Sequence, residues 1–195
     1  GRWHIEAGIA AACEGFGIND PVSCINRLMS KKLSKKQVEI LAGFFTVGES
    51  YFFRQPKMLE QFETILLPAF VFGGEEKKKR LRIWSSACSS GEEPYTLTII
   101  LNRQKLLLRD WEVEIYASDI SRESLEKAGA GIYSNWKLRN TPAWARRYFT
   151  EKKKNRFELH THLKEMVHFD YYNLVAADPL GFIEPGGSVD VILCC

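Results

Sequence analysis

The stretch Arg80–Tyr95 constrains the fold more than any other part of the chain. It begins with the apolar run 81–84, continues through small residues at 85–91, and reaches acidic residues and a proline at 92–94. This order predicts a strand, a tight turn and a helix. In open α/β sheets, ligands bind beyond the carboxyl end of such a strand, because backbone N–H groups and a helix N-terminus face the crevice there.

The residues of this turn also limit the kind of ligand. Their spacing differs from G-x-G-x-x-G, and the carboxylates of Glu92 and Glu93 would repel a pyrophosphate. We therefore expect a ligand with hydroxyls, an amine or a positive centre rather than a dinucleotide.

The segments that follow predict an α/β fold. An amphipathic helix at 96–108 and a strand at 113–119 complete a parallel strand–helix–strand unit. Residues 156–160 and 165–169 alternate apolar and polar side chains, which predicts an antiparallel insertion. The apolar run 189–195, after a turn at Pro185–Gly187, predicts a buried parallel strand.

The first part of the chain is predicted to be helical. Asp20 and Pro21 mark the start of a second helix, and Ser34 with Gln37 has the spacing of a capping box for a third. A further helix should begin at Pro56 and place its apolar side chains inward: Met58, Leu59, Phe62, Ile65 and Leu66. We place the boundary between the helical and α/β parts in the charged linker 75–80.

Composition excludes few classes of protein. Apolar residues make up 45% of the 195 residues, charged residues 26%, and the net charge of +3 permits an acidic partner without requiring one. The chain shows neither a signal peptide at its start nor an apolar run long enough to span a membrane, so we expect a cytoplasmic protein. The five cysteines include no C-x-x-C pair and are expected to be free thiols: Cys13, Cys24, Cys88, Cys194 and Cys195.

Two carboxylates are candidates for ligand binding. Asp119 ends the second strand, where an acidic residue can bind ribose hydroxyls, although it could instead cap the helix after Ser121. Glu93 could contact the ligand, cap the helix together with Ser90, or do both.

Other chemistries lack support in the sequence. His160, His162 and His168 have no carboxylate or cysteine at ligand spacing, so no metal site is predicted. The motifs of serine hydrolases, P-loop enzymes and zinc peptidases are also absent.

Several separate motifs resemble the chemotaxis receptor methyltransferases, the CheR family, over about residues 46–195. They are found at 51–54, 82–95, 117–120, 131–133, 147–149 and 173–174. The resemblance implies an S-adenosyl-L-methionine-dependent enzyme that methylates glutamates on the acidic cytoplasmic helices of chemoreceptors or a related signalling protein. It also implies a helical domain at 1–75 and a Rossmann-like domain at 76–195, with a β-subdomain inserted at about 146–170.

The family's site residues carry over by position. Arg54 would lie beside the reacting groups and orient the acceptor carboxylate, with Phe52 and Phe53 either closing the site or packing in the core. The implied cofactor contacts are Ser50, Arg54, Ala87 as the pocket floor, Glu92 or Glu93, Asp119 at the ribose, and Asn173 and Leu174 at the adenine.

The sequence also departs from the family pattern. Cys195 stands where the family has an arginine, and the family's later strands are absent, so we expect an incomplete sheet and a fragment inactive by itself. The short, lysine-rich loop 150–156 implies that substrate capture does not need a receptor tail. A scaffold or sensor that only binds the cofactor, and a methyltransferase with a different protein or small-molecule acceptor, remain alternatives.

Overall fold

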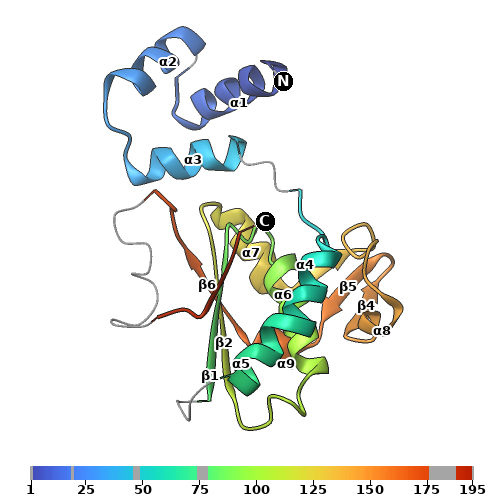
Figure 1. The fold of residues 1–195 in the computed structure, drawn as a ribbon. Helices are drawn as coiled ribbons and strands as arrows, with labels where there is room; N and C mark the ends of the chain where they lie inside the picture. The colour runs from blue at the N-terminus through green and yellow to red at the C-terminus, as the bar shows by residue number, and fades with distance from the viewer. Residues whose placement is uncertain (1, 19, 46–48, 74–78, 176–187, 195) are drawn as a thin grey trace.

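The fold is organised around a four-stranded parallel sheet (Figure 1). The computed structural model describes residues 2–18, 20–45, 49–73, 79–175 and 188–194. The strand order is β6-β2-β1-β7. The strands are β1 (Arg80–Ser86), β2 (Glu112–Asp119), β6 (Val167–Tyr171) and β7 (Val191–Cys194).

The register of the sheet brings three strand ends together. Ser86 pairs with Ser118 of β2 on one side and with Cys194 of β7 on the other. Because all the pairs are parallel, the turns after β1 and β2 emerge at the same edge. The predicted strand at 113–119 is thus confirmed. A parallel strand also forms within 189–195, at Val191–Cys194, but it lies at the edge of the sheet and only Leu193 is buried, so the expectation of a buried strand was wrong. Cys195 lies outside the described residues.

Helices cover the sheet. The helix α6 (Glu92–Arg103) lies between this sheet and a second, smaller sheet (Figure 1). It begins earlier than predicted and is buried along most of its length, so it is not the amphipathic helix expected at 96–108. The other helices are α4 (Pro56–Gln61), the π-helical η1 (Phe62–Leu66), α5 (Leu67–Gly73), α7 (Arg122–Ala130) and α9 (Thr161–Lys164), together with α8 (Ala143–Arg146), which lies beside the smaller sheet.

The smaller sheet is antiparallel, with the order β3-β5-β4. Its strands are β3 (Ile132–Ser134), β4 (Phe149–Lys153) and β5 (Arg156–Leu159). The expectation that 165–169 belongs to this insertion was wrong, because β6 pairs in parallel with β2. Apolar and polar side chains alternate in β6 because it is an edge strand with one face on the core. Val167 and Phe169 face the core, whereas His168 and Asp170 are exposed.

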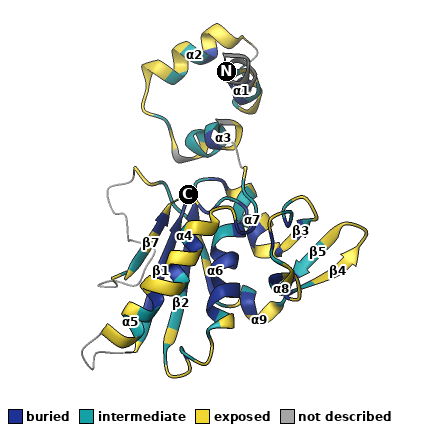
Figure 2. Cartoon of the chain, turned by 45° about the vertical axis from the view of Figure 1, so that its right-hand side comes forward, coloured by how far each residue is buried: buried dark blue, intermediate teal, exposed yellow. Residues whose placement is uncertain are grey.

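Three helices precede the sheet: α1 (Arg2–Gly15), α2 (Pro21–Ser30) and α3 (Lys35–Phe45). Both predicted caps form. Asp20 accepts from the backbone N–H of Ser23, and Ser34 and Gln37 bond reciprocally. In Figure 2, α2 is mostly exposed and α3 is mostly intermediate, whereas the central strands and α6 are buried.

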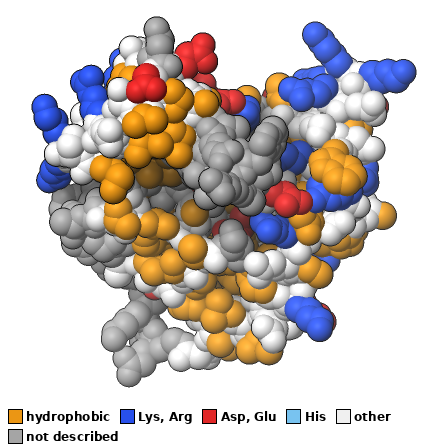
Figure 3. Space-filling model, turned by 90° about the horizontal axis from the view of Figure 1, so that it is seen from above, with side chains coloured by type: hydrophobic (Ala, Val, Ile, Leu, Met, Phe, Trp, Pro, Cys, Tyr) orange, Lys and Arg blue, Asp and Glu red, His pale blue; other side chains and the backbone are white. Residues whose placement is uncertain are grey.

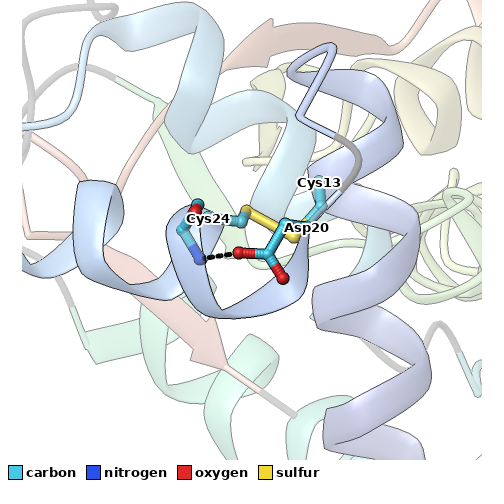
Figure 4. The surroundings of a disulfide bond; sticks show 4 residues. Cys13, Asp20 and Cys24 are labelled. Carbon is cyan, nitrogen blue, oxygen red and sulfur yellow. Dashed lines mark hydrogen bonds between the residues drawn. A yellow bond between two sulfur atoms is a disulfide. The ribbon is translucent and has the colours of Figure 1, made fainter.

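A disulfide between Cys13 and Cys24 joins α1 to α2 (Figure 4). The expectation of free thiols was therefore wrong for these two cysteines and holds for Cys88 and Cys194. The reason is packing: the turn between the helices places both cysteines in the buried face that α1 and α2 share, with their Cα atoms 5.7 Å apart. Spacing in the sequence does not show that approach.

The inward face predicted after Pro56 is only partly correct. Leu59 and Phe62 are buried, but Ile65 is 64% exposed and Leu66 is also exposed. The cause is η1, whose wider turn rotates the later side chains away from the core.

Some expectations lie outside the described residues, namely positions 75–78 of the linker predicted at 75–80 and the turn at Pro185–Gly187. The last residue of that predicted linker, Arg80, begins β1. Among the described residues, no helix is both long and apolar enough to cross a membrane.

Candidate cofactor site

The turn after β1 has an unusual backbone. Ala87, Ser89 and Gly91 all have positive φ angles, of 54°, 50° and 87°. Such angles are costly for residues with a Cβ, and they concentrate at binding sites. The amide of Cys88 donates to the carbonyl of Ser118 over 2.9 Å, which ties the turn to the end of β2.

Gly91 shows why the turn needs a residue without a side chain. A Cβ there would lie 2.9 Å from the Cβ of Ala128 and 3.2 Å from the Tyr133 hydroxyl. Glycine therefore lets α6 begin directly against α7 and β3.

Asp119 holds two turns with its one carboxylate. Its Oδ2 accepts from the amide of Ser89 over 2.7 Å, and its Oδ1 accepts from the amide of Ser121 over 2.8 Å. The helix cap of α7 is Ser121 itself, which accepts from the amide of Ser124. Asp119 lines the cavity described below, and each of its oxygens retains a lone pair that a ligand hydroxyl could use.

Glu93 lies across the end of β1. Its Oε1 accepts from the hydroxyl of Ser85 over 2.7 Å, and its side chain lines the same cavity. The predicted capping pair of Ser90 and Glu93 does not form, because Ser90 bonds to Glu92 instead.

Glu92 points away from the cavity. Its side chain is fully buried, accepts from the Ser90 hydroxyl, and lies 2.7 Å from the Nζ of Lys137. Lys137 also donates to the carbonyl of Ser50 over 2.7 Å. Glu92 is therefore part of a structural ion pair, and of the two acidic residues only Glu93 reaches the ligand cavity.

The segment 49–54 forms the opposite wall. Arg54 is exposed, donates to the carbonyl of Glu49 over 2.7 Å, and has its Cζ 5.8 Å from the centre of the Tyr51 ring. Phe52 and Phe53 are buried, and the Phe52 ring meets those of Tyr133 and Phe149 edge to face. Phe52 and Phe53 therefore pack in the core, which was one of the two roles left open for them; the other was to close the site.

These elements enclose a cavity of about 300 Å³. Five residues predicted for the site line it: Ser50, Arg54, Ala87, Glu93 and Asp119. The other lining residues are Glu49, Tyr51, Gln55, Met58, Leu59, Cys88, Ser89, Thr96 and Ser124.

The remaining predicted residues do not line this cavity. Leu174 is 47% exposed, and the side chain of Asn173 accepts from the amide of Val175 over 3.1 Å. Both lie just before residues 176–187, which are outside the described residues.

The negative charge of the cavity affects the neighbouring thiol. Burial, and then the charges of Asp119 and Glu93, raise the pKa of Cys88 well above its ordinary range. Cys88 therefore stays a neutral thiol and is a poor nucleophile. The carboxylates of Glu93 and Asp119, beside this neutral thiol, fit a ligand that carries hydroxyls and positive charge.

Sequence reasoning missed Lys137, Tyr51 and Thr96. Thr96 accepts from the amide of Phe53 over 3.3 Å and so fixes the opposite wall to α6. A polar residue inside an apolar helix was a usable signal for Thr96, but nothing near Lys137 in the sequence indicated its buried partner.

No cluster of three potential metal ligands occurs among the described residues.

Comparison with known proteins identifies the family. The family model described as the CheR methyltransferase, SAM binding domain, matches residues 48–195. The chain belongs to the CheR methyltransferase family. Its cofactor is therefore S-adenosyl-L-methionine, as the resemblance implied, and the cavity residues fit this group because carboxylates and apolar side chains such as Met58 and Leu59 face it together.

Curated relatives agree with this assignment. The chain is 32% identical to chemotaxis protein methyltransferase 2 of Vibrio cholerae over 83% of its own length, and 30% identical to the chemotaxis protein methyltransferase of Borreliella burgdorferi over 88%. Chemotaxis protein methyltransferase 1 of Pseudomonas aeruginosa is 29% identical over 99% of the chain. The matches cover 54%, 61% and 69% of these three proteins, so the chain spans little more than half of the first two.

Proposed function

We propose that this chain contributes the cofactor-binding part of a methyltransferase that forms methyl esters on glutamate side chains of chemoreceptors or a related signalling protein. The observation that carries the proposal is the shared cavity: Glu93 and Asp119 line one side, and the exposed guanidinium of Arg54 lines the other. The family and the names of the curated relatives support it.

Methyl transfer to a glutamate depends more on the positioning of the two reacting groups than on acid–base catalysis. The cofactor supplies a methyl group already activated on a positively charged sulfur. A glutamate with a pKa of about 4.3 is ionised at neutral pH, so no general base is required. Holding two reacting groups in line can lower a barrier by roughly 7–11 kcal/mol.

Different residues of this chain would bind the cofactor, orient the acceptor and exclude water. In this proposal Asp119 and Glu93 bind ligand hydroxyls and positive charge, and Arg54, which lines the same cavity, orients the acceptor carboxylate. Met58 and Leu59 line the cavity with apolar surface, which favours removing water from the nucleophile.

The acceptor is proposed to be acidic on the grounds of charge. In Figure 3, lysine and arginine side chains gather at two separate edges of the face seen from above. Such edges attract an acidic partner at moderate ionic strength.

The test is transfer of a labelled methyl group in the full-length protein. The acceptor is the purified cytoplasmic fragment of a chemoreceptor from the same organism, and modified residues are mapped by mass spectrometry. We expect alkali-labile esters on glutamates and a loss of roughly 100-fold in kcat/KM for Arg54→Ala, as misplacement of a reacting group can cause. The matched control is Lys57→Ala, an exposed cation three residues away that does not line the cavity.

Two results would contradict the proposal. Binding of S-adenosylhomocysteine without methyl transfer would favour a scaffold or sensor. Label found on another residue type would indicate a different acceptor.

A further inference from the structure

The turn that precedes Arg54 contains a bulky residue in a left-handed conformation. Phe53 has a φ angle of 57°, a value that is rare for a large side chain. Strain of this kind persists only where the surrounding structure holds it, and it concentrates at functional sites. Phe52 and Phe53 are both buried, whereas Arg54 is exposed and lines the cavity. In this conformation two consecutive aromatic side chains enter the core and the next side chain reaches the cavity.

Two hydrogen bonds from other elements hold the turn. The amide of Phe52 donates to the carbonyl of Lys137 over 3.0 Å, and the amide of Phe53 donates to the Oγ1 of Thr96 on α6 over 3.3 Å. The Phe53 ring also meets the Trp144 ring edge to face, with the ring centres 5.7 Å apart. Of the two acceptors, only that of Thr96 belongs to a side chain, so a substitution at this position removes one hydrogen bond and leaves the backbone intact.

The hydroxyl of Thr96 is engaged inside the protein, although the residue lines the cavity. Thr96 is 1% exposed, and its Oγ1 donates to the carbonyl of Glu92 over 2.7 Å. Because its one proton is used there, the oxygen can only accept from the Phe53 amide. Valine has nearly the same shape as threonine but no hydroxyl. It would remove the acceptor of a buried amide, which costs free energy.

We propose that Thr96 is a positioning residue for methyl transfer, because its hydroxyl holds the strained turn at Phe53 and thereby sets where the Arg54 guanidinium lies in the cavity. This inference rests on the proposed function, in which Arg54 orients the acceptor carboxylate. Without the hydrogen bond, the φ angle of Phe53 can relax towards negative values, which moves Arg54. A misplacement of about 1 Å can cost roughly 100-fold in rate, so the relaxed turn lowers kcat.

The test compares two buried threonines of α6 in the full-length protein. Thr98 is the matched control, because it is fully buried, donates to the carbonyl of Tyr95 over 2.9 Å, and does not line the cavity. The acceptor is the cytoplasmic fragment of a chemoreceptor from the same organism. We expect Thr96→Val to lower kcat about tenfold and Thr98→Val to stay within twofold of wild type. Thr96→Ser, which keeps the hydroxyl, should recover most of the loss.

Three further measurements follow how Thr96 acts. Hydrogen exchange of the Phe53 amide should be at least tenfold faster in Thr96→Val and within twofold of wild type in Thr98→Val. The affinity for S-adenosylhomocysteine should stay within twofold in both variants, which also verifies their folding. Because Thr96 acts through Arg54, combining Thr96→Val with Arg54→Ala should lower kcat no further than Arg54→Ala alone.

The outcomes separate this inference from the proposed function. With an active wild type, a normal kcat in Thr96→Val, equal losses in Thr96→Val and Thr98→Val, or additive losses with Arg54→Ala would overturn the positioning role. Unchanged exchange of the Phe53 amide would overturn it too, as would a weakened affinity for S-adenosylhomocysteine in Thr96→Val, because Thr96 would then act on the cofactor. No methyl transfer by the wild type would contradict the proposed function and this inference together.

Discussion

The Nζ of Lys137 lies 2.7 Å from the carboxylate of Glu92, whose side chain has no exposed surface. The same ammonium group donates to the carbonyl of Ser50, so one lysine joins the start of α6 to the opposite wall of the cavity. The ion pair therefore acts on the shape of the cavity without lining it.

Removing this lysine should destabilise the fold. Lys137→Met leaves the Glu92 carboxylate buried without a counter-charge, a change that costs about 3 kcal/mol or more in comparable pairs. We expect that loss in the free energy of unfolding measured by urea denaturation.

Two controls accompany this measurement. Adding Glu92→Gln to Lys137→Met should recover most of the stability, because no buried charge remains. Lys127→Met breaks an exposed pair with Glu123 and should cost less than about 1 kcal/mol. Equal losses in Lys137→Met and Lys127→Met would show that the pair with Glu92 has no special role.

Glu158 should make the free energy of unfolding depend on pH in the acidic range. Hydrogen bonds from Lys152 and Lys164 lower the pKa of Glu158 to about 2. A lowered pKa means that the folded protein holds this proton less tightly, so the contribution is present above the ordinary pKa and is lost as the pH falls towards 2. The stability difference between wild type and Glu158→Gln should therefore shrink between pH 5 and pH 2 in urea titrations. If the stability difference between wild type and Glu158→Gln did not change with pH, the ionised Glu158 carboxylate would not stabilise the folded protein.

The two described free cysteines should react differently. Cys194 is exposed, whereas Cys88 is buried with its pKa raised by burial and by Asp119 and Glu93. Because the thiolate is the reactive form, iodoacetamide at pH 8 should modify Cys194 at least tenfold faster than Cys88 in the folded protein. Peptide mapping of the modified sites measures both rates, and equal rates in the folded state would contradict the buried position of Cys88.

The disulfide should stabilise the first helices without affecting the ligand cavity. Cys13 and Cys24 close a short loop between α1 and α2, for which chain entropy predicts roughly 2–3 kcal/mol. We expect the paired substitution Cys13→Ala with Cys24→Ala to speed limited proteolysis within α1 and α2. Affinity for S-adenosylhomocysteine, measured in parallel, should stay unchanged, and a parallel loss would show that the helices support the cofactor site.

Much of the fold could be predicted because its signals are local. The strand β1, the turn after it and the cap at Ser121 follow from short patterns of apolar, small and capping residues. The strand β6 was misassigned because an edge strand and an antiparallel strand share the same alternation, and only the pairing with β2 distinguishes them.

The site was predictable where residues follow strand ends and less so where partners are distant. Asp119 was predicted from its position at the end of β2, and Glu93 from its position at the start of the helix that follows β1. The choice between Glu92 and Glu93 depends on Lys137, more than forty residues away in the sequence, and so could not be made from the sequence.

The central claim is that the cavity bounded by Glu93 and Asp119 holds S-adenosyl-L-methionine. Its most direct test is calorimetric titration of the full-length protein with S-adenosylhomocysteine, comparing wild type with Glu93→Gln and with the exposed control Glu112→Gln. We predict one site per chain, an affinity about tenfold weaker in Glu93→Gln, and no change in Glu112→Gln. Wild-type affinity in Glu93→Gln, or no binding by the wild type, would contradict the account.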